Sequence, residues 1–418
     1  MQTTRRQRLW TIQRSTARRL TDWRLRVVLV ALVVSLVPTV ASAHARWFTP
    51  YGPYWEPEWS RIWSLPVLLA LGAAAGAVTV LAIGERLTRD PLWPRPPVFQ
   101  RLEPAAPAIL GVQAAITLIY AASQMTLFVP NIPLPHSVVG YGVAGIVVVA
   151  GFSFITGVLS RVGALLVLGL FGLAFAYGSW YEAMEQVLFV GIAVYLLAVG
   201  RGVVRSEDGR EEDRTALSDW LRPHALTILR VTVGASIVIL GFTEKLIAPD
   251  LTVAFLREYP EFNVLGSLGL SWFTDERFTY TAGIVEITAG AALISGKLIR
   301  VVIVGLWIPF NLGIAFLPPQ ELIGHLPILA AIYVLLVRGT EGIPAPGERS
   351  SQPSPPAGGR RRPDRRASPD AHRPITSRRH ARRPDDPDQR RSPAPPPARS
   401  VGYGFATDVA DGPQRGRA

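Results

Sequence analysis

The chain has 418 residues, of which 49% are hydrophobic, and its formal net charge is +12 at pH 7. It contains no cysteine, which excludes disulfide scaffolds, thiol relays, iron–sulfur clusters and cysteine-ligated zinc for this chain alone. Several apolar runs approach the length of about 20 residues that a helix needs to cross a bilayer. The composition therefore predicts a membrane protein.

The first 43 residues combine an arginine-rich lead, an apolar run over 27–37 and a small-x-small site that ends at Ala43. These are the parts of a secretory signal peptide, but a retained first transmembrane helix would show the same pattern. Both interpretations stay open. Residues 44–64 are rich in Trp and Tyr, whose rings prefer the headgroup layer. We expect this segment to lie along the outer membrane interface.

Nine further apolar segments predict transmembrane helices. They cover roughly 65–83, 107–129, 138–157, 162–180, 183–200, 225–247, 279–296, 300–317 and 321–337. Arg and Lys gather in alternate loops, among them a linker at 203–222, and the loops between these are nearly uncharged or acidic. Cytoplasmic loops carry the excess of Arg and Lys. The pattern predicts a multi-pass protein of the inner (cytoplasmic) cell membrane with a cytoplasmic C-terminus.

The last segment, 341–418, is rich in Pro, Arg, Ser and Asp and has few large apolar side chains. Such a segment buries too little surface to offset its chain entropy, so it predicts a disordered cytoplasmic tail. Its arginine clusters would contact anionic lipids of the inner leaflet. The tail lacks interleaved aromatic residues, and we expect no specific nucleic-acid binding.

Two stretches, 102–202 and 223–338, resemble each other in sequence. The matched positions include Pro104 and Pro223, Glu182 and Glu321, Gly157 and Gly296, and Arg161 and Arg300. Because each stretch holds four predicted spans, both would start on the same side of the membrane, as in a parallel repeat. The predicted fold is all-α: two tandem parallel four-helix transmembrane units with a structural Gly-x-Leu-x-Arg corner in each, N-terminal helices, and the disordered tail.

Ionisable residues inside membrane helices are costly and are candidate functional residues by default. The second unit has six polar candidates, which its topology places in the outer half of one bundle: Glu244, Lys245, Glu286, Asn311, Glu321 and His325. The first unit has Met125 and Thr126 in place of the first two, and only valines near Val147 in place of the third. This contrast favours a functional site. The alternative is that Lys245 pairs with Glu286 or Glu321 only to neutralise buried charge.

A metal site is not expected. If the signal is cleaved after Ala43, His44 becomes an N-terminal histidine, which offers two nitrogens that suit Cu(II). No second histidine is placed to complete that site, so we expect an incidental histidine at this position.

The second unit resembles the DoxX family of small membrane proteins. The resemblance rests on Arg230-x3-Gly234, on Gly241-x3-Lys245-Leu246, and on Gly283-x2-Glu286-x3-Gly290 followed by Gly296-x3-Arg300. It implies that Lys245, Glu286 and Arg300 are family positions. Some DoxX-like proteins are subunits of quinone-linked membrane redox complexes. The duplication, the N-terminal region and the basic tail depart from the family pattern.

The sequence leaves three functions open. The first is a redox-complex subunit that contacts a quinone, for which an oxidoreductase partner subunit would supply the electrons. The second is a carrier of a small solute or protons, and the third is a membrane scaffold without chemistry. We expect no stand-alone enzymatic activity.

Overall fold

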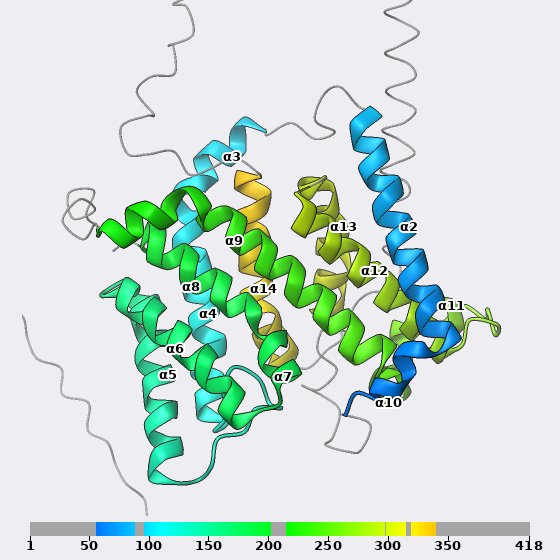
Figure 1. The fold of residues 1–418 in the computed structure, drawn as a ribbon, viewed down its shortest axis with the longest axis horizontal. Helices are drawn as coiled ribbons and strands as arrows, with labels where there is room; N and C mark the ends of the chain where they lie inside the picture. The colour runs from blue at the N-terminus through cyan, green and yellow to red at the C-terminus, as the bar shows by residue number, and fades with distance from the viewer. Residues whose placement is uncertain (1–55, 88–95, 202–214, 297, 315–318, 340–418) are drawn as a thin grey trace, which may run out of the picture. The chain divides into compact units, whose positions relative to one another are not determined.

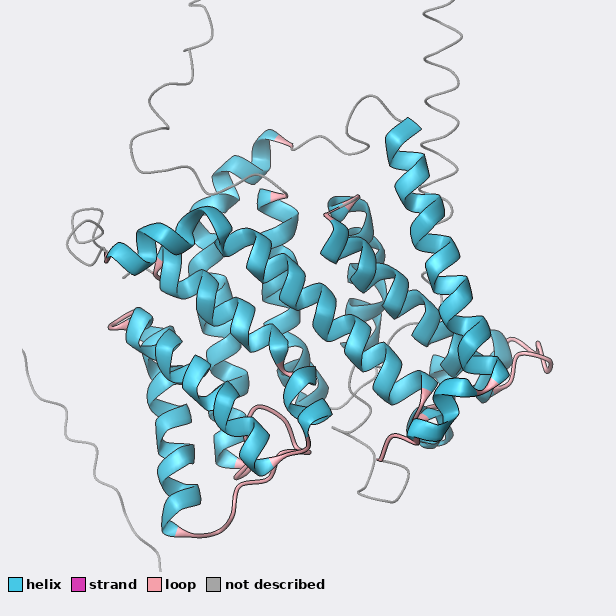
Figure 2. Cartoon of the chain, in the orientation of Figure 1, coloured by secondary structure: helices cyan, strands magenta, loops and turns pink. Residues whose placement is uncertain are grey.

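The structure, a computed structural model, describes residues 56–87, 96–201, 215–296, 298–314 and 319–339, without the side chains of Glu85, Leu87 and 308–321. The signal or first helix, His44, most of the linker and the basic tail lie outside the described residues. Within them every regular element is helical, so the predicted all-α class is confirmed (Figure 1). Figure 2 shows loops joining the helices and no strand in the described ranges.

Six helices of the described residues are long and apolar enough to cross a membrane. They are Leu65–Gly84, Pro97–Ser123, Val138–Thr156, Ser160–Tyr177, Ala216–Leu246 and Asp275–Ser295. Val187–Val199 and Leu322–Arg338 are shorter apolar helices. The protein is therefore a multi-pass membrane protein.

The helices follow the predicted spans along the chain. The long elements are α2 (Leu65–Leu87), α4 (Ala106–Ser123), α5 (Val138–Thr156), α6 (Ser160–Tyr177), α8 (Val187–Val199), α9 (Ala216–Leu240), α12 (Asp275–Ser295), α13 (Ile299–Ile314) and α14 (Pro319–Arg338). The short elements are η4 (Trp59–Trp63), α3 (Pro97–Leu102), η5 (Glu103–Ala105), α7 (Trp180–Glu185), the π-helix η7 (Gly241–Leu246), α10 (Pro249–Glu258), η8 (Pro260–Phe262) and α11 (Val264–Ser267).

Two predicted spans differ from the observed helices in an informative way. The predicted span 107–129 ends early, at Ser123, because the backbone of Met125 and Phe128 takes positive φ angles of 52° and 70°. The predicted span 183–200 is broken at Gln186 into α7 and α8. Both changes occur where α4 and α8 meet the loops at one end of the bundle.

The helices present apolar side chains outward as well as inward, as lipid requires. On α5, Val139, Val149 and Phe152 are exposed, whereas Val147 and Ala150 are buried. A water-soluble helix would place polar residues on the exposed face. The exposed apolar face of α5 is therefore suited to acyl chains.

Packing between helices follows a regular pattern. Along 106–199, α4 contacts α5, α5 contacts α6, and α6 contacts α8. Along 216–338, α9 contacts α12, α12 contacts α13, and α13 contacts α14. Two further contacts cross between these groups, because α8 lies along α9 and α14 lies along α4 (Figure 1). The four helices α4, α8, α9 and α14 are called the central helices below, and α2 packs on α12 outside them.

The two Gly-x-Leu-x-Arg corners have the same backbone geometry. Gly157 ends α5 with φ of 79°, and Gly296 ends α12 with φ of 79°. Leu159 and Leu298 both have φ of 51°, a left-handed conformation that is uncommon for a residue with a side chain. Each corner turns the chain directly into the next helix.

The corner arginines make matching contacts to the fourth helix of each group. Arg161 Nε donates to the backbone oxygen of Leu197 on α8, and Arg300 Nε donates to that of Leu336 on α14, both at 3.2 Å. These carbonyls lie in the last turn of their helices, where backbone oxygens have no hydrogen-bond donor within the helix. The arginines therefore supply hydrogen-bond donors to the carbonyls at these helix ends.

Helices α9 and α12 cross where each has a glycine. A Cβ placed on Gly234 would lie 2.5 Å from the backbone oxygen of Gly290, and the reverse distance is also 2.5 Å. Small residues at a crossing let the backbones approach closely, and this is a common basis of helix association in membranes.

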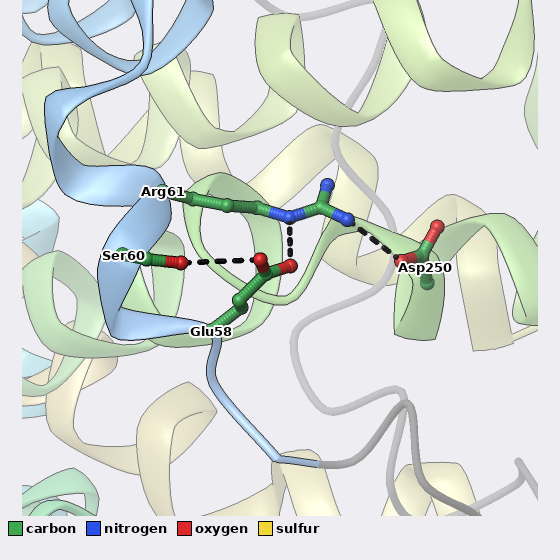
Figure 3. Close-up of polar contacts among 4 residues, drawn as sticks. All are labelled: Glu58, Ser60, Arg61 and Asp250. Carbon is green, nitrogen blue, oxygen red and sulfur yellow. Dashed lines mark hydrogen bonds and ion pairs between the residues drawn. The ribbon is translucent and has the colours of Figure 1, made fainter.

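The segment before α2 docks on the loop after α9. The amide of Glu58 donates to the carbonyl of Ile247 at 2.8 Å. Arg61 contacts Glu58 through Nε and Asp250 of α10 through Nη2, the latter at 3.2 Å (Figure 3). The hydrogen bond from Arg61 lowers the pKa of the Glu58 carboxyl group. In the described part of the predicted interfacial segment, Trp63 is largely exposed and Trp59 stacks on Trp180 of α7.

The glycine crossing gives a direct test. We expect Gly234→Ala to lower the free energy of unfolding by about 1–3 kcal/mol, because the added methyl group cannot fit against backbone. Gly142→Ala on α5 is the matched control, since its Cβ would meet no atom within 4 Å. Thermal unfolding of both variants in detergent measures the difference. Equal stability would show that α9 and α12 do not cross at this point.

Candidate functional site

The structure gives the side-chain positions of four of the six predicted site residues. Glu244 and Lys245 lie in the π-helix η7 at the end of α9, and Glu286 lies within α12. His325 lies on α14 and is buried. The side chains of Asn311 and Glu321 are outside the described residues.

A π-helix carries the first two residues. It follows α9 directly, and all its residues except Phe242 are buried. Widened turns of this kind are rare and occur frequently at functional sites. The sequence alone did not predict it, because the apolar pattern of a π turn differs little from that of an α turn over six residues.

The three charged groups Glu244, Lys245 and Glu286 form one buried cluster, called the charged triad below. Lys245 Nζ lies 3.4 Å from Glu286 Oε1 and 3.9 Å from Glu244 Oε2. The exposed fractions of the side chains are 0% for Lys245, 1% for Glu244 and 6% for Glu286. The charge-neutralising alternative named Glu286 or Glu321 as the partner of Lys245, and the structure places Glu286 beside it.

Two glycines make room for the triad. A Cβ on Gly241 would lie 3.0 Å from Cβ of Glu286 and 3.2 Å from its Oε2. A Cβ on Gly283 would lie 3.2 Å from Cβ of Lys245. The absence of side chains at both positions therefore lets η7 and α12 approach closely enough for the ion pair. The glycines of the quoted sequence pattern thus have a steric role at the site.

The triad is not balanced in charge. Two carboxyl groups face one ammonium group, and charges in a region of low dielectric interact strongly. Burying charges costs several kcal/mol per ion before pairing offsets it. Within the triad itself, the second carboxyl group can accept a proton or a hydrogen bond from a ligand while Lys245 keeps one acid beside it.

Glu185 is a buried acid that the sequence analysis did not select. Its side chain accepts a hydrogen bond from Thr243 Oγ1 at 2.7 Å, and its backbone oxygen accepts one from Ser236 Oγ at 2.7 Å. Glu185 is 2% exposed. It links α7 to η7, so the first predicted unit contacts the turn that carries the triad. The sequence feature that could have identified Glu185 is its position as an acid near the start of the predicted span 183–200, next to Gln186.

Glu182, by contrast, has a local structural role. Its Oε2 accepts hydrogen bonds from the amide and hydroxyl of Ser179, which caps α7, and its Oε1 accepts one from Asn131 Nδ2. Such reciprocal capping stabilises a helix start. Glu321 matches Glu182 in the sequence repeat. Helix capping is therefore an alternative to the predicted role of Glu321 in the site.

No group of three or more His, Cys, Asp or Glu side chains among the described residues could hold a metal ion. His44, the one metal candidate of the sequence, lies outside them. Comparison with known proteins adds no identity: no family model, no curated protein and no solved structure matches the chain. The DoxX resemblance stays a prediction.

The charge imbalance predicts unequal effects of removing the two partners. Lys245→Met leaves two buried carboxyl groups without their cation, and we expect a loss of about 3–5 kcal/mol in unfolding free energy. Glu286→Gln leaves Lys245 with Glu244, so its cost should be much smaller, roughly 1 kcal/mol. Unfolding of the purified variants in detergent at neutral pH measures both values. Equal losses would contradict the assignment of Lys245 as a cation shared by two acids.

Proposed function

We propose that the core is a duplicated, DoxX-like arrangement of two parallel four-helix units, 102–202 and 223–338. The matching φ angles of the two corners and the matching Arg161 and Arg300 contacts support it. Reciprocal contacts support it further, because α8 packs on α9 as α14 packs on α4. Two hydrogen bonds between the units also match: Thr117 Oγ1 of the first unit donates to Ile323 O of the second, and Ser236 Oγ of the second unit donates to Glu185 O of the first.

The membrane orientation is also a proposal. The loop charges favour the inner cell membrane, with the basic tail in the cytoplasm against anionic lipids. In this orientation the charged triad lies toward the outer surface, and the end of α14 lies toward the cytoplasm.

We propose that the chain is a quinone-contacting subunit of a membrane redox complex, with the charged triad as its ligand site. One observation carries this proposal. The repeat relates the triad to Met125, Thr126 and Val147 in the first unit, where Val147 is buried in an apolar core and has no exposed surface. The proposed first unit has the equivalent corner but no charged residue at these three positions, so the repeated helix arrangement does not require them. A costly charged cluster that the fold does not need points to function.

The surroundings of the triad suit a quinone. A hydrophobic cluster formed by α2, η7 and α12 adjoins it, including Val67, Leu246 and Ile247, with Ile284 packed against it. Ligand sites of this class combine apolar walls with a few polar groups. Lys245 would donate a hydrogen bond to a quinone oxygen, and Glu286 would exchange the proton. An oxidoreductase partner subunit would supply the electrons.

A second candidate is a carrier of protons or a small solute. The hydrogen bond between Thr243 and Glu185 favours it, because it places a third buried acid where the two proposed units meet. Transporters with repeated units bind substrates at the repeat interface. A scaffold without chemistry remains the alternative to both, and the basic tail would then recruit partners.

Quinone binding by the purified full-length protein tests the first proposal. We expect a short-chain ubiquinone analogue to quench tryptophan fluorescence saturably, and we expect Glu286→Gln to weaken binding roughly tenfold, the equivalent of one hydrogen bond to a charged group. Glu103→Gln is the matched control, since Glu103 is also a largely buried, ion-paired acid, held by Arg338 at 3.0 Å.

The outcomes separate the three functions. Quinone binding that Glu286→Gln weakens and Glu103→Gln leaves intact supports the redox subunit. Proton or solute flux in liposomes that depends on Glu185 and Glu286, without quinone binding, supports the carrier. If neither binding nor flux is found and Glu286→Gln is silent, the triad has no ligand and the scaffold remains.

A further inference from the structure

A second buried polar cluster lies at the end of the central helices opposite the charged triad. Tyr195 of α8 has no exposed surface, and Arg338 ends α14 with 6% of its surface exposed. Arg338 Nη2 lies 3.0 Å from Glu103 Oε1 on η5. The charged groups that act on the Tyr195 hydroxyl are Arg338, Glu103 and Arg222 of α9. Four elements thus meet around one phenol.

Two buried donors of this cluster, the Tyr195 hydroxyl and Arg338 Nε, have no acceptor among the described residues. The side chain of Arg338 hydrogen-bonds the Tyr195 oxygen but can only donate to it, so the hydroxyl proton still lacks an acceptor. Buried polar groups are almost always hydrogen-bonded, so each exception calls for an explanation. A phenol can donate or accept, whereas a guanidinium nitrogen can only donate. The missing partner is therefore an acceptor.

The charge of the cluster specifies the acceptor further. Among the described side chains around the Tyr195 hydroxyl, Arg222 and Arg338 carry two positive charges and Glu103 carries one negative charge, so this cluster favours an anion. Arginine binds phosphate oxygens particularly well, because its planar nitrogens match their geometry. Arg338 is the last residue of α14, and Glu103 precedes α4, so the cluster lies at the level where these membrane helices end. Lipid phosphates lie at that level of a bilayer, and basic pockets between helices bind such headgroups.

We propose that Tyr195, Arg338 and Arg222 form a phosphate-binding site between the central helices. The ligand is the phosphate of an anionic lipid headgroup or free phosphate, which share the chemistry that the site recognises. Arg338 holds the oxygens with its guanidinium group, Tyr195 donates its hydroxyl proton to them, and Arg222 adds the second positive charge. This site is independent of the charged triad and of its proposed function.

Lipid titration of the delipidated full-length protein tests the site. Phosphatidylglycerol should raise the unfolding temperature, and diacylglycerol, which lacks the phosphate, should not. Inorganic phosphate distinguishes the two sources: stabilisation by phosphatidylglycerol alone identifies a lipid site, and stabilisation by both identifies a site for phosphate in general. If neither probe stabilises the protein, the proposal is wrong.

Tyr195→Phe removes the hydroxyl whose proton lacks an acceptor. Without added lipid this variant should unfold close to the wild-type temperature, because the lost contact with Arg338 is offset by the removal of a buried proton without an acceptor. With phosphatidylglycerol it should bind about tenfold more weakly, and Arg338→Lys, which keeps the charge but loses the planar fork, should also bind more weakly.

Tyr333→Phe on α14 is the matched control. Its hydroxyl already donates to Leu102 O at 3.4 Å, at the same end of the bundle, so phosphatidylglycerol affinity should not change. If Tyr195→Phe binds phosphatidylglycerol as tightly as Tyr333→Phe, the hydroxyl does not contact a phosphate and the proposal is overturned.

Discussion

A lysine ammonium group with no exposed surface depends on its neighbours for every compensating interaction. Lys245 lies between Glu244 and Glu286, within 4 Å of both. Their close approach requires two glycines without side chains and a π turn that places two consecutive charged residues in the interior. In hydrocarbon no water replaces a lost partner, so each of these features is constrained by the others. The packing of α9, η7 and α12 is organised around this pairing.

Much of the fold was predictable because lipid imposes simple rules on sequence. Long apolar runs predicted the long helices of the described residues but not the short ones such as α10, and loop glycines and arginines predicted the two corners. A pairing of Lys245 with an acid was also predictable, since a buried lysine needs one, but the sequence left Glu286 and Glu321 open as the partner. The ends of helices were less predictable. Met125 and Phe128 take left-handed conformations for reasons of local loop packing that no periodicity records.

The missed residues share one physical property. Glu185 and Thr243 are far apart in sequence and meet only because α7 packs on α9. Tyr195 and Arg338 likewise belong to different helices and share one end of the central helices. Hydropathy identifies the helices but not which of them become neighbours. The contacts between the two proposed units are therefore the part of the site that only the three-dimensional structure reveals.

The contact between α4 and α14 has a consequence for biosynthesis. Thr117 donates to the backbone oxygen of Ile323, at a sequence separation of 206 residues. At a translation rate of roughly 5–20 residues per second, α4 would wait roughly 10–40 s for its partner to be made. During that interval lipid or an insertion chaperone must occupy the surface that α14 later covers. The last helix of the described residues thus completes the packing of one that is synthesised much earlier.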